Sequence, residues 1–90
     1  MKAVRKTVDM IAVFRRGEIP EPVRFRYTDH MGKEVVIKID KVIDLHIDNF
    51  NTPKNITYTC QSLVGRRQLQ YDIQYIGREI RWELYKVGEI

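Results

Sequence analysis

The sequence predicts an all-β fold, a small antiparallel barrel or roll of the SH3-like kind with five to six strands. Apolar residues recur at every second position from Val23 onward, as they do when successive strand residues point to opposite faces of a sheet. Short turn-rich stretches separate these alternating segments, and none of the segments carries a strong helical stripe. Together these patterns favour a meandering sheet that curls over its own apolar face.

Length and composition indicate one domain, residues 1–90. An apolar fraction of 43% and a charged fraction of 31% are ordinary for a folded globular chain. Cys60 is the only cysteine, which excludes an intramolecular disulfide. Asp9 interrupts the apolar stretch near the N-terminus, so no signal peptide is expected, and no run is long enough to span a bilayer. We therefore expect a cytoplasmic protein that does not contact a membrane.

Residues 1–21 are predicted to form an N-terminal strand or a short helix, followed by a connection that contains Pro20. Apolar residues occur at both odd and even positions of this segment, so its pattern leaves the strand and the helix open. Residues 22–88 are predicted to form the β meander, with a strand at 23–28 and a hairpin loop at 29–33, where Gly32 can adopt a positive φ. Residues 34–48 form the longest strand candidate, and breaks in their alternation predict a bend near 40–42.

The C-terminal part of the chain contains the clearest alternation. Residues 56–64 and 69–76 are predicted to pair as a hairpin around a turn at Gly65. A last strand follows from Ile80, with Trp82 and Leu84 on its apolar face.

Few residues of the sequence are candidates for catalysis or metal binding. Asp44, His46 and Asp48 share one strand face, and we interpret them as a solvated outer face rather than a metal site, since no clear fourth ligand accompanies them. Cys60 has the parity of the core and is interpreted as a buried, inert thiol. No phosphate loop, nucleophile elbow or carboxylate pair is recognisable. The sequence therefore predicts no enzyme, no metal and no cofactor.

Aromatic and basic residues allow two interpretations. The aromatic side chains could form a stacking platform for nucleic acid, but most share parity with Ile and Val, which favours a place in the core. The net charge is +4, and residues 1–26 hold seven basic and three acidic side chains. The candidate phosphate contacts are Arg24, Arg26, Arg66 and Arg67.

Three segments, 22–27, 39–42 and 82–87, carry a resemblance to known proteins. Through them the chain resembles small uncharacterised bacterial β proteins of clostridial type. It is also loosely similar to a short domain of unknown function encoded near translesion DNA polymerases, from which it departs in the Asn-rich loop at 49–55. The resemblance implies a β barrel in a bacterial cytoplasm and assigns no functional residue.

Two functions remain as hypotheses. The favoured one is a non-catalytic protein-interaction module, which captures a partner or associates with itself through an exposed β edge, in particular the run 35–39 or the N-terminal strand. The alternative is a small barrel that binds nucleic acid through its arginines.

Overall fold

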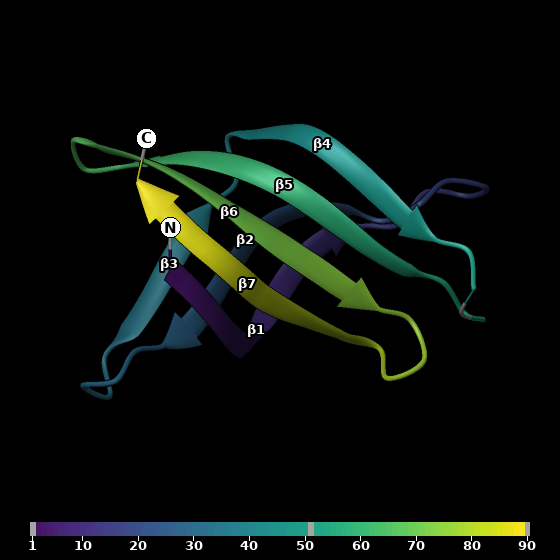
Figure 1. Cartoon of the computed structure of the whole chain (residues 1–90), viewed down its shortest axis with the longest axis horizontal. Helices are drawn as coiled ribbons and strands as arrows, with labels where there is room; N and C mark the ends of the chain where they lie inside the picture. The colour runs from purple at the N-terminus through teal and green to yellow at the C-terminus, as the bar shows by residue number, and fades with distance from the viewer. Residues whose placement is uncertain (1, 51, 90) are drawn as a thin grey trace.

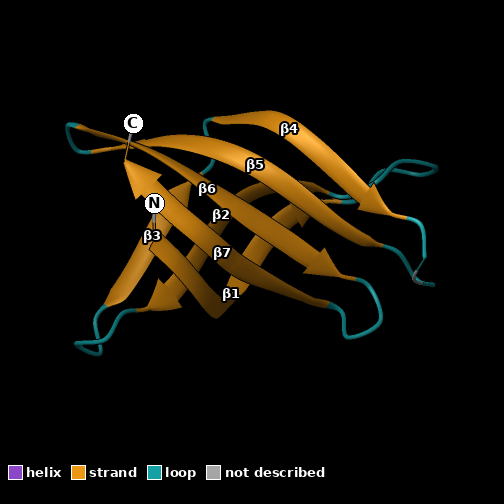
Figure 2. Ribbon diagram, viewed as in Figure 1, coloured by secondary structure: helices purple, strands orange, loops and turns teal. Residues whose placement is uncertain are grey.

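The computed structural model of the chain describes residues 2–50 and 52–89, so Met1, Asn51 and Ile90 of the predicted domain lie outside the described residues. All of its regular structure is strand (Figure 2). The strands are β1 (Lys2–Val13), β2 (Glu21–Thr28), β3 (Glu34–Lys38), β4 (Lys41–Asp48), β5 (Asn55–Val64), β6 (Arg67–Ile76) and β7 (Arg81–Glu89). The all-β prediction is confirmed.

The strand count is seven rather than five to six, and two elements account for the difference. The N-terminal segment is a strand, which settles the alternative between strand and helix. The long strand predicted at 34–48 is interrupted at Ile39 and Asp40, so it forms both β3 and β4. β4 also carries a register shift between Val42 and Asp44, which confirms the predicted irregularity and places it slightly later.

The seven strands form one antiparallel sheet in the order β3-β2-β1-β7-β6-β5-β4. β1 bends sharply in its middle (Figure 1), and the bend divides its partners. Its first part pairs with β7 as far as Val8, and its second part pairs with β2 from Asp9 onward. A larger layer of β4–β7 with residues 2–8 therefore faces a smaller layer of residues 9–13 with β2 and β3. The result is a curled half-barrel.

The core lies between the two layers and is formed by the apolar side chains at alternate positions of the strands. Its buried members are Val8, Phe25, Ile37, Ile56, Tyr58, Cys60, Tyr71, Ile73, Trp82 and Leu84. The rings of Phe25 and Tyr71 meet edge to face with centroids 5.5 Å apart, across the space between the layers. The alternation from Val23 onward thus reports one shared interior, as predicted.

The connection between β3 and β4 closes one end of the half-barrel. The amide of Asp40 donates to the carbonyl of Gln61 at 3.1 Å, and the Ser62 hydroxyl donates to the carbonyl of Lys38 at 2.6 Å. An acceptor and a donor of β5 therefore hold Asp40 in the connection and Lys38 at the end of β3. At the other end, β3 and β4 diverge and remain the two end strands of the sheet (Figure 1).

The two prolines that precede Val23 lie in different settings, although neither can donate a main-chain hydrogen bond to a ladder. Pro20 lies in the connection, as predicted, and its carbonyl accepts a hydrogen bond from the buried hydroxyl of Tyr58. Pro22, in contrast, lies within β2, an internal strand. It is tolerated there because its partner Ala12 follows a register shift in β1, where the ladder is already interrupted.

Candidate interaction surface

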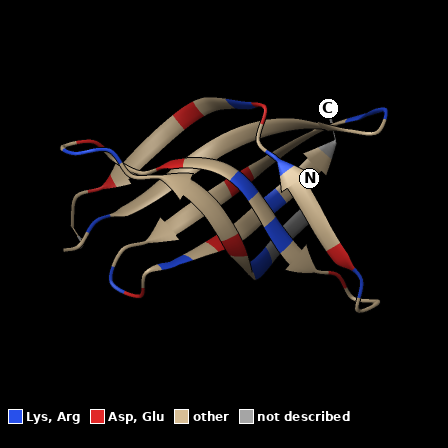
Figure 3. Ribbon diagram, turned by 180° about the vertical axis from the view of Figure 1, so that it is seen from behind, with Lys and Arg blue, Asp and Glu red and all other residues tan. Residues whose placement is uncertain are grey.

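The structure places the four arginines singled out from the sequence in two groups. Arg24 and Arg26 project from the outer face of β2 in the smaller layer. Arg66 lies in the turn between β5 and β6, and Arg67 begins β6 in the larger layer. From behind, basic and acidic segments are interspersed over the strands and turns (Figure 3). The arginines thus lie on different layers of the sheet rather than on one face.

Arg26 is held by two carboxylates. Its Nε is 3.0 Å from Oδ2 of Asp9, and its Nη1 is 3.2 Å from Oε1 of Glu34. The hydrogen bond to Asp9 and the charge of Glu34 raise the pKa of the Arg26 guanidinium above its usual value. Cross-strand register produces this arrangement, because Asp9 is the direct partner of Arg26 on β1. Two neutralising carboxylates make Arg26 a poor contact for phosphate.

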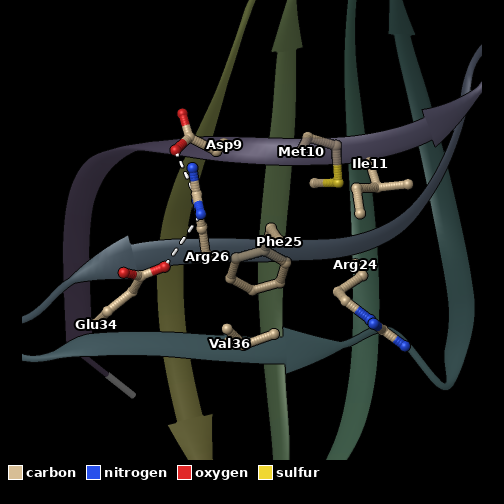
Figure 4. A pocket seen from close by; sticks show the side chains of 8 residues that line it. All are labelled: Asp9, Met10, Ile11, Arg24, Phe25, Arg26, Glu34 and Val36. Atoms are coloured by element: carbon tan, nitrogen blue, oxygen red, sulfur yellow. Dashed lines mark hydrogen bonds and ion pairs between the residues drawn. The ribbon is translucent and has the colours of Figure 1, made fainter.

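These residues border a shallow depression on the outer face of the smaller layer (Figure 4). Its volume is about 420 Å³. The depression is amphipathic, since the exposed apolar side chains of Ile11 and Val36 lie beside the charged ones. The lining residues are Asp9, Met10, Ile11, Arg24, Phe25, Arg26, Glu34 and Val36. Because its lining mixes charged and apolar side chains, the depression does not indicate one class of ligand.

Cys60 is completely buried, as predicted. Burial raises the pKa of the Cys60 thiol to about 12, with a smaller contribution from the charge of Asp72. A thiol with so high a pKa is protonated near neutral pH and is a poor nucleophile.

The face that carries Asp44, His46 and Asp48 is the outer face of β4, where these residues pair with Thr59, Thr57 and Asn55. Within residues 2–50 and 52–89, no group of three His, Cys, Asp or Glu side chains is placed to hold a metal ion.

Glu83 departs from expectation. The alternation places it on the polar outer face with Arg81, yet its side chain is only 6% exposed. It occupies the middle of the larger layer, opposite Thr7 of β1 and Gln74 of β6, and the longer side chains of Arg5 and Arg81 lie beside it. Oε2 is 3.2 Å from Arg81, whereas Oε1 has no hydrogen-bond partner among the described residues. Position within a wide sheet therefore buries a charge that periodicity assigns to solvent.

The two end strands offer different edges. β3 confirms that the run 35–39 borders the sheet, but it is only five residues long and has Glu34 and Lys38 at its ends. Short, charged edges resist pairing with other chains. The N-terminal strand, expected as the other edge, lies between β2 and β7, so that prediction is wrong. Its bend lets it serve both layers, which gives it a neighbour along each part.

β4 is the edge that the sequence did not reveal. It is eight residues long, and most of it is exposed on both faces. The apolar side chains of Val42, Ile43 and Leu45 remain 41%, 41% and 42% exposed. The smaller layer does not cover them, because the half-barrel opens toward this strand. The alternation at 43–47 predicted a core strand, and only the irregularity at Lys41 and Val42 hinted that β4 leaves the core.

The chain matches no family model, no curated protein and no solved structure. The described part of the chain contains no helix that could cross a lipid bilayer.

Proposed function

We propose that this protein is a non-catalytic interaction module that binds an extended protein segment along β4. The observation that carries the proposal is the exposure of Val42, Ile43 and Leu45 on a strand that ends the sheet. An end strand presents a row of unpaired main-chain groups, and an added strand satisfies them while covering apolar side chains. Exposed apolar residues on such an edge favour aggregation unless a partner covers them.

Apolar and polar side chains alternate between the two faces of β4, next to which a segment would add. Leu45 and Ile47 share the inner face with Tyr58 and Ile56 of β5, whereas His46 lies on the outer face. A segment that alternates apolar and polar residues would extend both faces of the sheet, because side chains in paired strands keep to the same sides.

The test is a titration of the isotope-labelled protein with eight-residue peptides that alternate apolar and charged residues, followed by nuclear magnetic resonance. The amides of β4 are expected to shift first, and Leu45→Lys is expected to abolish the shifts by placing a charge on the apolar edge. Leu63→Lys is the matched control, because Leu63 is 60% exposed on β5, an internal strand. Shifts confined to other strands, or none at millimolar peptide, would refute the proposal.

The nucleic-acid alternative has weaker support. Arg26 is neutralised by Asp9 and Glu34, and Arg66 lies on a different layer from Arg24. The alternative predicts binding to DNA or RNA at low salt that falls linearly with the logarithm of salt concentration. A titration at low salt without binding excludes it.

A further inference from the structure

We infer that the segment that adds to β4 is β4 of a second copy of this chain, joined antiparallel about a twofold axis at Leu45. The inference rests on the proposed function and names its partner. It begins from the residues around Leu45: Asp44 and His46 are its two neighbours, and both lie on the outer face of β4, opposite the face of Leu45.

Antiparallel pairing about a twofold axis makes each residue face a defined residue of the copy. With the axis at Leu45, Leu45 faces Leu45 of the second copy, and Asp44 faces His46 of the second copy. Ile43 lies at the register shift of β4, so the regular pairing is centred on residues 44–46. The exposed side chain of Leu45 is thereby covered, and the contact between Asp44 of one copy and His46 of the other occurs twice in the dimer.

The two neighbouring registers place like charges opposite each other. In these registers the twofold axis moves by one residue, because only such a shift keeps the inner faces of both strands on the same side of the sheet. An axis at Asp44 places Asp44 opposite Asp44 of the second copy. An axis at His46 places Asp44 opposite Asp48 of the second copy. Like charges directly opposite destabilise a strand pair, so the axis at Leu45 is selected.

In the single chain, a main-chain donor on the β4 edge is bonded to a side chain of the same strand. The Leu45 amide donates to Oδ1 of its neighbour Asp44 at 2.9 Å. This side-chain acceptor satisfies a main-chain donor locally. On pairing, the carbonyl of Leu45 of the second copy would replace Asp44 as acceptor, and the carboxylate would turn to His46 of the second copy. The exchange conserves hydrogen bonds and adds the apolar contacts.

The contact along one short strand is small, so the dimer is expected to be reversible and concentration-dependent. Sedimentation velocity of the full chain over a range of concentrations measures it directly. Wild type is expected to dimerise. His46→Asp, which sets two carboxylates opposite each other, is expected to weaken association about tenfold for two altered pairs. Asp44→His with His46→Asp together restores complementarity and is expected to restore the dimer.

Disulfide trapping tests the register without relying on affinity. Leu45→Cys is expected to form a disulfide dimer under mild oxidation, because directly opposite residues bring their Cα atoms about 5.5 Å apart. In this register, position 46 of one chain lies opposite position 44 of the other chain. His46→Cys is therefore expected to form far less disulfide dimer. Leu63→Cys on β5 is the control for random collision, and the native Cys60 is buried.

The outcomes separate the two proposals. A chain that stays monomeric, yet binds alternating peptides along β4, overturns the twofold dimer and retains the interaction module. A dimer that persists unchanged in Leu45→Lys and His46→Asp overturns the register. A monomer that also binds no peptide along β4 overturns both. Circular dichroism of each variant checks that its strands are intact.

Discussion

Ser62 of β5 and Lys38 of β3 are joined by a hydrogen bond of 2.6 Å from the Ser62 hydroxyl to the Lys38 carbonyl. The same hydroxyl oxygen lies 2.6 Å from the hydroxyl of Tyr71. A serine hydroxyl has one hydrogen, and Ser62 gives it to the carbonyl, so Tyr71 donates to Ser62. One buried side chain thus satisfies a tyrosine of β6 and a main-chain acceptor of β3.

We therefore expect Ser62→Ala to destabilise the protein by about 1–3 kcal/mol, because it leaves the buried Tyr71 hydroxyl and the Lys38 carbonyl without this partner. Urea unfolding followed by Trp82 fluorescence measures the change. Tyr71→Phe is the matched variant: it removes one donor and leaves the bond to Lys38, so a smaller loss of about 1 kcal/mol is expected. A Ser62→Ala protein as stable as wild type would show that the junction does not depend on this bond.

Alkaline pH is expected to unfold the protein through three buried acids. Burial raises the pKa of the Cys60 thiol to about 12, and it raises the pKa values of the Tyr58 and Tyr71 phenols above their usual range. In the unfolded chain these groups ionise near their ordinary values, about 8.5 for Cys and about 10 for Tyr. The unfolded state then releases protons that the folded state retains. The free energy of unfolding therefore stays constant with respect to these groups below about pH 8 and falls as pH rises toward 12.

Denaturant unfolding at a series of pH values measures this slope. Thiol labelling with a chromogenic disulfide supplies the control at about pH 8, where Cys60 should react in urea and stay unreactive in the folded protein. Rapid labelling of the folded protein would contradict the burial on which the prediction depends.

How far the sequence predicts this molecule depends on what periodicity reports. Alternation located the strands and the core face correctly around Phe25, Tyr58 and Ile73, because it records which side chains share a side. It carries no information on whether a strand lies in the middle or at the end of a sheet. Leu45 therefore shows the same alternation as the core residues, although it lies on an exposed edge. Glu83 likewise alternates with apolar residues as a solvated side chain would, although it is buried in an internal strand.

The candidate site was predictable only in part for the same reason. Edge pairing was anticipated, and β3 confirms one of the two expected edges, but strand order decides which edges exist. Likewise, the neutralisation of Arg26 by Asp9 and Glu34 depends on the register of three strands, which the chain does not reveal locally. Charge counting along the sequence could not detect it.

The turn between β6 and β7 contains an unfavourable residue. Ile80 has a φ of 52°, in the left-handed region that β-branched side chains rarely adopt, and its side chain is 81% exposed. Asn adopts this region readily, and almost no buried apolar area is lost on replacement. Ile80→Asn is expected to stabilise the protein by about 0.5–1 kcal/mol, measured as a rise in Tm. Ile11→Asn, at another exposed apolar position that lies in a strand, is expected to give no such gain.

The Arg26 ion pairs are expected to contribute little to stability, because Arg26 and both carboxylates are more than half exposed. Exposed pairs typically contribute about 0.2–1 kcal/mol and weaken as salt screens them. Arg26→Gln should therefore lower the free energy of unfolding only slightly in low salt, and the difference from wild type should vanish near 1 M salt. A double-mutant cycle with Asp9→Asn isolates the pair. A loss that persists in high salt would mean that the aliphatic part of Arg26 packs over Val36 and contributes through apolar contact.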